Sequence, residues 1–323
     1  MSDKAGVEEV AVPSAAKPTF FAKVKAHFKK WWWVHVIIFC AVVLIIALPL
    51  VYVGYPNIAQ EDIDHSTLTV ESMVITDPKP DSFQLDQRQV IGSGSIFHPK
   101  IYEFEAEVSL QGSPPFAIAT VPEVVSAKDG TPVHIQQRLD LTDPGQFAAF
   151  STAVMMNEEF HLGVYGNPDL KLGALPKIDV KYNKTVTMKG LNKLAGFDIT
   201  ELHLDPGRED GNNANGTVFI PNPSVLQLSM GNLTLDVSSN GVYLGQSFLN
   251  DLVLVPGDNH VPMLSKLNNT RLLDALSGGS TVIPLTIVGN SSVYNGQEIP
   301  YFTAALAANE LTIDLDLLAV LGE

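Results

Sequence analysis

Residues 216–245 read GTVFIPNPSVLQLSMGNLTLDVSSNGVYLG, and this stretch indicates the fold more directly than any other. Within it, residues 226–230 and 233–237 alternate apolar and polar side chains, as strands with one buried and one wet face do. Pro221 and Pro223 cannot donate to a strand ladder, so the preceding strand bends or ends there. The stretch predicts short antiparallel strands joined by tight turns.

The same period of two continues on both sides of this stretch. Asn240–Gly241 is the dipeptide of a type I′ hairpin turn, and other Gly, Pro and Asn pairs separate further alternating segments. We expect strands at residues 67–75, 101–110, 133–141, 160–164, 178–188, 217–220, 226–230, 233–237, 282–288 and 311–317. Many short strands at regular spacing predict a sandwich or a barrel.

Two helices are predicted to interrupt the strands. Asp143 is a capping residue, Pro144 suits the first helical position, and Gln146 stands where a capping box requires it, so we expect a helix over residues 147–156. A shorter helix is expected at residues 271–276, with caps from the three polar residues before it.

A weak internal repeat indicates the domain organisation. Residues 130–139 resemble residues 257–267, and each segment precedes a predicted helix and then an apolar strand. We therefore predict a mainly all-β protein. Its N-terminal transmembrane helix is followed by two tandem antiparallel β-sandwich domains with short helical insertions, at residues 56–195 and 196–323.

Residues 34–53, VHVIIFCAVVLIIALPLVYV, form the one long apolar run, with 20 residues and no formal charge. A helix of this length spans about 30 Å, which matches a hydrocarbon core. Three tryptophans precede the run and Tyr55 follows it, as in an interfacial aromatic belt. The run is longer than the apolar core of a cleaved signal peptide, so we predict a signal anchor at residues 31–55.

The charges on the two sides of the span predict its direction. Residues 1–30 carry six lysines and three acidic residues, whereas the first lysine after the span is Lys79. The positive-inside rule then places residues 1–30, predicted to be a disordered basic tail, in the cytoplasm, and residues 56–323 in a lumen or outside the cell. All five Asn-x-Ser/Thr acceptor sites follow the span and agree with this topology: Asn183, Asn215, Asn232, Asn268 and Asn290.

The composition excludes several classes of function. The net charge of −15 opposes binding to nucleic acid. A single cysteine, Cys40, rules out a disulfide framework, a cysteine-rich zinc site and an iron–sulfur cluster.

The strings at residues 216–225, 230–237 and 240–245 resemble the late-embryogenesis-abundant type 2 domain, with its order of strand, Asn-Pro, strand, glycine turn and strand. The resemblance covers about 120 residues of the chain. It implies antiparallel β-sandwiches of immunoglobulin-like or fibronectin-like shape.

The region after the span is also similar to a domain of unknown function in fungal single-pass membrane proteins. The residues that carry this similarity are 142–150, 158–162, 188–191, 254–259 and 294–301. The resemblance implies a fungal protein, with the vacuolar membrane favoured and the plasma membrane or endoplasmic reticulum as alternatives. It further implies lipid held in an apolar groove, and it brings no catalytic residues.

Motifs of enzymes are weak in this sequence. Residues 92–95 lack the register of a nucleophile elbow, and no phosphate-binding loop occurs. The acidic loop 205–213 is a calcium candidate or a solvated loop, and Asp314 with Asp316 is a carboxylate pair or a wet strand face. We predict no enzyme, no catalytic residue, no cofactor and no metal. A hydrolase with a dispersed site is the remaining alternative.

The predicted helix at residues 147–156 supplies the candidate ligand site. Phe147, Phe150, Val154 and Met155 either face a lipid at the open end of a sandwich or bury the helix in the core. The sequence thus predicts a signal-anchored protein whose β-sandwiches bind lipid or a protein partner. An extracellular structural or adhesion module is the alternative.

Overall fold

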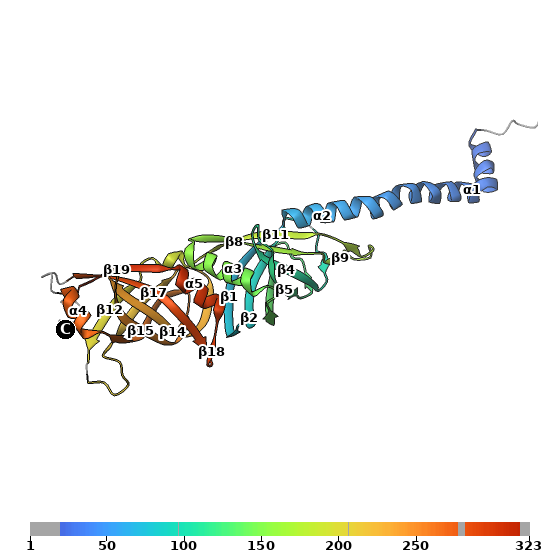
Figure 1. Ribbon diagram of the computed structural model, residues 1–323. Coiled ribbons are helices and arrows are strands. Elements are labelled where there is room, and N and C mark those ends of the chain that lie inside the picture. Colours follow the sequence, from blue (N-terminus) through green and yellow to red (C-terminus); the bar gives the residue numbers. More distant parts are fainter. Residues whose placement is uncertain (1–19, 96, 206, 277–281, 317–323) are drawn as a thin grey trace, which may run out of the picture. The chain divides into compact units, whose positions relative to one another are not determined.

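The computed structural model describes residues 20–95, 97–205, 207–276 and 282–316 (Figure 1). Residues 1–19 of the predicted tail and Leu317 of the last predicted strand lie outside the described residues. The chain divides into two compact units, Met1–Tyr55 and Pro56–Glu323. We call the second one the β unit.

The first unit is helical. It contains α1 (Phe20–Pro49) and the π-helical turn η1 (Leu50–Gly54), and α2 (Tyr55–His65) follows. Residues 20–30, predicted to belong to a disordered tail, are helical, because Phe20, Val24 and Phe28 repeat at helical spacing with no glycine or proline between them. Trp31 leaves the helical region, with φ −118° and ψ 17°, and marks a kink.

The structure confirms the long apolar helix near the N-terminus. The stretch His27–His65 has 39 residues and a window of mean hydropathy 3.1, so its length and composition suit a membrane span. Pro49 has no backbone N–H to continue the helix, and the wider turn η1 follows it, with the Tyr55 N–H donating to the Leu50 carbonyl. The direction of the span stays a prediction.

The β unit is mainly strand, which confirms the predicted fold class. Within the described residues its largest sheet, sheet A, has 11 strands in the order β12-β13-β16-β15-β14-β1-β2-β7, with β17 on β14 and with β18 and β19 on β17. The bounds are β1 (Thr67–Lys79), β2 (Ser82–Gly92), β7 (Thr131–Asp140), β12 (Asp198–Leu204), β13 (Ala214–Asn222), β14 (Leu226–Ser239), β15 (Val242–Leu254), β16 (Gly257–Leu267), β17 (Val282–Tyr294), β18 (Gln297–Glu298) and β19 (Glu310–Asp316).

Two smaller sheets complete the β unit. Sheet C has the order β11-β8-β4-β5, with β4 (Phe104–Leu110), β5 (Pro115–Val121), β8 (Glu159–Gly166) and β11 (Tyr182–Lys189). Sheet B has the order β10-β9-β3-β6, with β3 (Lys100–Ile101), β6 (Val124–Val125), β9 (Asp169–Lys171) and β10 (Ile178–Asp179). The predicted strands 101–110 and 178–188 are each interrupted, whereas 226–230 and 233–237 merge into β14.

β14 connects the two halves of the β unit, by which we mean the predicted domains 56–195 and 196–323. Its first residues pair in parallel with β1, Met73 lying opposite Leu226 and Ile75 opposite Leu228. Its later residues pair with β17 instead. The change of partner occurs at Gly231, whose φ is +72° and where a Cβ would come within 2.4 Å of the Val293 carbonyl oxygen. Only glycine fits this bend.

The predicted helix over 147–156 is confirmed as α3 (Pro144–Met156), and the Asp143 carboxylate accepts the Gln146 N–H at 3.0 Å. The second predicted helix is α4 (Asn269–Leu276). A further helix, α5 (Pro300–Ala308), was not predicted. It is more similar to α3 than α4 is. Both α3 and α5 begin with proline, end at an asparagine and lead into a strand.

The predicted domain boundary at 195/196 falls beside a tight turn, η2 (Asn192–Leu194), whose three residues have positive φ. The Leu191 N–H donates to the Val154 carbonyl at 2.7 Å, and the Asn192 N–H donates to the Asn157 carbonyl at 3.0 Å. The chain between the halves is therefore bonded to the end of α3. Both halves lie in one compact unit, and the division into two sandwiches stays a prediction.

Candidate binding surfaces

The four side chains that the sequence offered as lipid-facing lie in the core. Phe147, Phe150, Val154 and Met155 are between 2% and 5% exposed. The Phe147 ring lies 5.1 Å from the Phe83 and Phe116 rings and 4.8 Å from the Tyr301 ring of α5, measured between centroids. α3 therefore joins strands of the first half to a helix of the second.

The cavities around this cluster are small. One of about 50 Å³ lies against Phe147 and Phe150, and two of about 40 and 30 Å³ lie beside Met155. An apolar cavity that holds benzene measures about 150 Å³, so each of these three is too small for an acyl chain. The largest also holds a polar pair, in which Gln87 donates to Gln89 at 2.7 Å.

Four of the five acceptor asparagines are exposed: Asn183, Asn232, Asn268 and Asn290. Asn215 is partly buried. Asn290 Nδ2 donates to Asp236 at 2.7 Å, and the oxygens of Asn232 and Asn268 accept backbone N–H groups. The side-chain amide of Asn183, in contrast, makes no hydrogen bond with the described residues.

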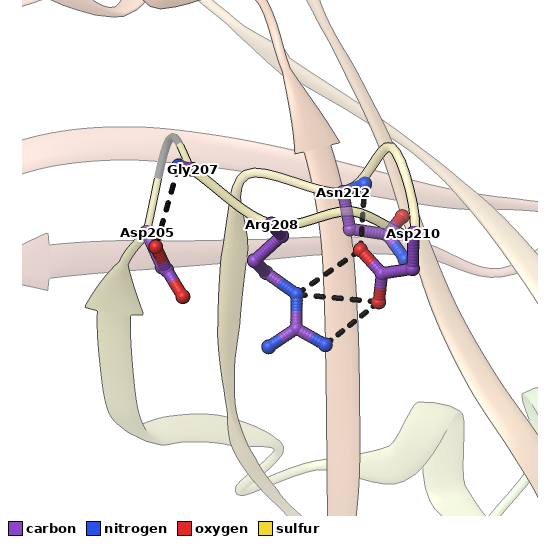
Figure 2. A network of polar contacts seen from close by, with 5 residues as sticks. All are labelled: Asp205, Gly207, Arg208, Asp210 and Asn212. Carbon is purple, nitrogen blue, oxygen red and sulfur yellow. Dashed lines mark hydrogen bonds and ion pairs between the residues drawn. The ribbon is translucent and has the colours of Figure 1, made fainter.

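The acidic loop 205–213 contains an internal ion pair (Figure 2). Arg208 Nε lies 3.1 Å from Asp210 Oδ1, and Arg208 Nη2 lies 2.7 Å from Asp210 Oδ2. Figure 2 also shows the Asn212 N–H donating to Asp210 and the Gly207 N–H donating to Asp205. The hydrogen bond from Arg208, with that from Asn212, holds the pKa of Asp210 well below its ordinary value. This carboxylate already has a cation, which disfavours the calcium interpretation.

The other titratable candidates are dispersed. Asp314 lies exposed on β19, and His134 and His161 lie on β7 and β8, where they contact Asp86 at 2.8 Å and Thr187 at 2.9 Å. Among the residues that the structure describes, no group of three or more His, Cys, Asp or Glu side chains is placed to hold a metal ion.

One end of the β unit is organised around α2, and we call it the α2 end. Lys184, only 7% exposed, donates from Nζ to the carbonyls of Ile63, Asp64 and Ser66, the last two at 3.0 and 2.6 Å. The last carbonyls of a helix have no partner within it, and a cation there is favourable. Burial lowers the pKa of Lys184, and the nearby Asp64 raises it.

Side chains of α2 add further bonds at this end. Gln60 donates to the Lys181 carbonyl at 2.9 Å and accepts the Lys181 N–H at 2.8 Å. Ser95 donates from Oγ to Asp62 at 2.7 Å. α2 is thus bonded through its side chains and its last carbonyls to β11 and to the chain after β2.

The loop 205–213, the turn 240–241 and α4 gather at another end, which we call the loop end. Asn213 holds it together, because its amide donates to the Leu267 carbonyl at 2.7 Å and accepts the Leu267 N–H at 2.8 Å. Arg271 of α4 donates to the Tyr243 carbonyl at 2.7 Å. Asn240 and Gly241 have φ of 49° and 77°, which confirms the predicted type I′ turn.

The strand pairing places these two ends far apart. β1 starts at the α2 end and runs beside the parallel strand β14, which continues to the loop end. From Thr67 to Ile75, and then from Leu228 to Ser239, the path is about 60 Å at ~3.3 Å a residue.

A groove of about 360 Å³ lies on the outer face of sheet C, and we call it the sheet C groove. Its central row crosses four strands, since Asn183 pairs with Tyr165, Tyr165 with Glu107, and Glu107 with Ile118. Lys181, Asn167 and Glu105 line one end. The Tyr165 phenol covers Gly163, where a Cβ would come within 2.6 Å of its Oη.

Sequence reasoning missed this groove. The alternation of Glu103, Glu105 and Glu107 signals an outward acidic face, and the order Gly163-x-Tyr165 signals an aromatic ring leaning over a glycine. These signals lie on different strands, and only the pairing of β4, β8 and β11 brings them together.

Comparisons of sequence give one match. A family described as a protein of unknown function, DUF3712, matches residues 114–237. This segment covers less than half of the chain and crosses the predicted boundary at 195/196. A search of curated proteins gave no match.

Solved structures with loose similarity include bacterial adhesins and a periplasmic chaperone. An adhesin from Mobiluncus mulieris is 9% identical, with 75% of this chain and 84% of that chain covered and a TM-score of 0.19. The periplasmic chaperone SfaE is 12% identical, with 77% and 98% covered and a TM-score of 0.18. The CupB6 tip adhesin from Pseudomonas aeruginosa is 8% identical, with 69% and 94% covered and a TM-score of 0.17. At these TM-scores the likeness carries no argument about function.

Proposed function

We propose that this chain is a signal-anchored, single-pass membrane protein whose β unit faces a lumen or the cell exterior and binds a protein partner, without catalysis, through the loop end. The observation that carries the proposal is the placement of the loop end about 60 Å along the strands from α2, the helix that follows the apolar span. Such an arrangement presents a set of ordered loops away from the anchored end.

The loops at this end are already ordered by internal bonds. Asn213 ties its loop to β16, and Arg208 pairs with Asp210 inside the loop. Because these contacts exist before any partner arrives, binding there has less conformational entropy to lose. Clustered end loops on a β scaffold are a common site of recognition.

The charge at the loop end indicates the chemistry of the partner. Among the described residues at this end, the carboxylates of Asp205, Glu209, Asp210, Asp274 and Asp316 outnumber the basic side chains of Arg208, Lys266 and Arg271. An acidic surface favours a partner with a basic surface, and such attraction speeds association and weakens with salt.

Photo-crosslinking in cells tests the binding surface. A photoreactive amino acid in place of Tyr243, which is 46% exposed at the loop end, should crosslink to a protein whose yield falls when salt is raised in isolated membranes. The matched control is the same amino acid in place of Val253, which is 44% exposed on β15 away from the loops. Equal crosslinking from both positions contradicts the proposal.

The topology has its own test. A protease added to sealed vesicles should remove an epitope at residue 2 and leave one at residue 323 protected, because the lysine-rich side of the span is predicted to be cytoplasmic. Protection of the N-terminal epitope instead would overturn the orientation.

Lipid binding is the second candidate, and the observation that favours it is the mostly apolar lining of the cavity beside Phe147 and Phe150. A lipid needs this cavity of about 50 Å³ to expand considerably. Native mass spectrometry of the full chain tests this candidate and should detect one bound lipid per chain. Ala119→Leu places a larger side chain in the cavity and should abolish lipid binding. Ile118→Leu, on the outer face of the same strand, is the control and should keep the lipid.

The resemblances stated from the sequence lead to further proposals. The resemblance to the fungal single-pass membrane proteins supports a fungal source and the vacuolar membrane, with the plasma membrane and endoplasmic reticulum as alternatives. A fluorescent fusion of the full chain, viewed in a fungal host, distinguishes them. Signal confined to the cell surface favours the adhesion alternative.

A further inference from the structure

We propose that the sheet C groove is the seat of a glycan attached to Asn183, and that the first sugars of this glycan pack on Tyr165. The proposal rests on the topology proposed above, since a lumenal β unit is what exposes Asn183 to glycosylation. It adds a specific intramolecular binding site to that topology.

Position is the first argument. Asn183 lies directly opposite Tyr165 on the neighbouring strand, and side chains of such pairs stand about 5 Å apart. Both project from the outer face of sheet C and line the same groove. A sugar joined to Asn183 Nδ2 therefore begins within the groove.

The groove also has suitable chemistry. The ring of Tyr165 gives an apolar surface for the C–H face of a sugar, and its hydroxyl is a polar edge. Glu107 follows Tyr165 in the same row, and Glu105 and Asn167 lie one row away. Carboxylate and amide groups accept hydrogen bonds from sugar hydroxyls.

The volume and the backbone fit this use. The groove measures about 360 Å³, within the range of ligand pockets of ~300–1,000 Å³. Gly163 makes room for the phenol, because any larger residue would displace Tyr165. Asn290 Nδ2 already donates to Asp236, whereas the side-chain amide of Asn183 makes no hydrogen bond with the described residues.

Attachment favours this occupant over a free carbohydrate. A tethered sugar has an effective concentration in the millimolar range, so even a weak contact with Tyr165 is populated. In the attachment reaction, Nδ2 of Asn183 bonds to the anomeric carbon of a lipid-diphosphate-linked oligosaccharide. The bond from that carbon to the diphosphate breaks, the lipid diphosphate leaves, and the amide proton passes to solvent.

The experiment is a thermodynamic cycle on the full chain expressed in a eukaryotic secretory host. Glycopeptide mass spectrometry should find Asn183 occupied. Thr185→Ala removes that acceptor site and should lower Tm by about 2 °C, a shift of the size that one modest contact gives. In a Tyr165→Leu background the same change should leave Tm unaltered, and in a Tyr165→Phe background, where the ring remains, the shift should persist.

Thr234→Ala, which removes the acceptor site at Asn232, is the matched control and should show no dependence on residue 165. An endoglycosidase that leaves one sugar on each site should preserve the stabilisation at Asn183. Occupied Asn183 with equal shifts in the parent chain and in the Tyr165→Leu background overturns the groove as the glycan's seat, and so does an empty Asn183 beside occupied sites elsewhere. Absence of glycan at all five sites contradicts the lumenal topology itself, so the two failures are distinguishable.

Discussion

The two ends of the β unit are stabilised by different means. At the α2 end a buried lysine donates to two carbonyls of α2 and to the Ser66 carbonyl just after it, whereas at the loop end an asparagine and an ion pair order the loops. Buried charge-assisted bonds are strong and costly to lose, and exposed ion pairs contribute little. The difference teaches that α2 is firmly bonded to the strands of the β unit, while the loops at the loop end are ordered by weaker contacts.

The core between the ends gives the largest expected effect and tests whether they share one folding unit. Phe147→Ala should lower the free energy of unfolding by about 3–5 kcal/mol, because it removes a ring packed between both halves. Thermal unfolding followed by circular dichroism measures this, with Phe97→Ala as control, since Phe97 is 45% exposed. Hydrogen exchange should speed up at both ends together. Faster hydrogen exchange at one end alone would contradict a shared core.

Lys184→Met should sharpen the contrast at the α2 end. Removing the ammonium takes this donor from the Asp64 and Ser66 carbonyls, while the Ile63 carbonyl still accepts from Ser66, at a cost of about 2–3 kcal/mol. Hydrogen exchange should accelerate in α2 and β11 and stay unchanged in α4. Lys189→Met, on the exposed face of the same strand, is the control and should have little effect. An unaltered exchange rate in α2 would mean that the lysine does not hold the helix.

Asn213→Ala should produce the corresponding loss at the loop end, and a smaller one. Its two hydrogen bonds to Leu267 disappear, so the free energy of unfolding should fall by about 1–2 kcal/mol. The amides of residues 207–212 should exchange faster, and those of α2 should not change. If α2 responds as strongly as the loop, the two ends are not independent.

Arg208→Ala gives the smallest effect, which appears in pH dependence. The pKa of Asp210 is below its ordinary value of 3.8, so the ion pair contributes above that pH and is lost as pH falls through the lowered pKa. In the variant, a carboxyl NMR titration should show this pKa rising toward 3.8. A pKa that stays low would assign the shift to the backbone of Asn212 instead.

Local patterns in the sequence predicted the elements that are decided by neighbours in the chain. The apolar run, the alternating strands, the cap at Asp143 and the turn at Asn240–Gly241 all belong to this class. Each depends on residues within a few positions, and the physical rule for each is local.

The missed features depend on distant partners. β2 was not predicted because Gln87 and Gln89 occupy inward positions and break the alternation. α5 is only 9 residues long, and it is stabilised by packing against both α3 and β17, which no local pattern reveals. The position of the four candidate lipid-facing side chains on α3 also depends on distant partners. An apolar helix can cover a cavity or lie in the core, and the sequence of the helix alone does not distinguish the two.

The parallel contact between β1 and β14 has a mechanical consequence. If the chain is held at the α2 end and pulled at the loop end, the load passes from β1 into β14 through the three register pairs from Met73–Leu226 to Ile75–Leu228. The strands then slide in shear, so these bonds resist together and do not open one at a time as in a peeled hairpin. Pulling from these two ends in force spectroscopy should therefore meet more resistance than peeling β19 from the sheet.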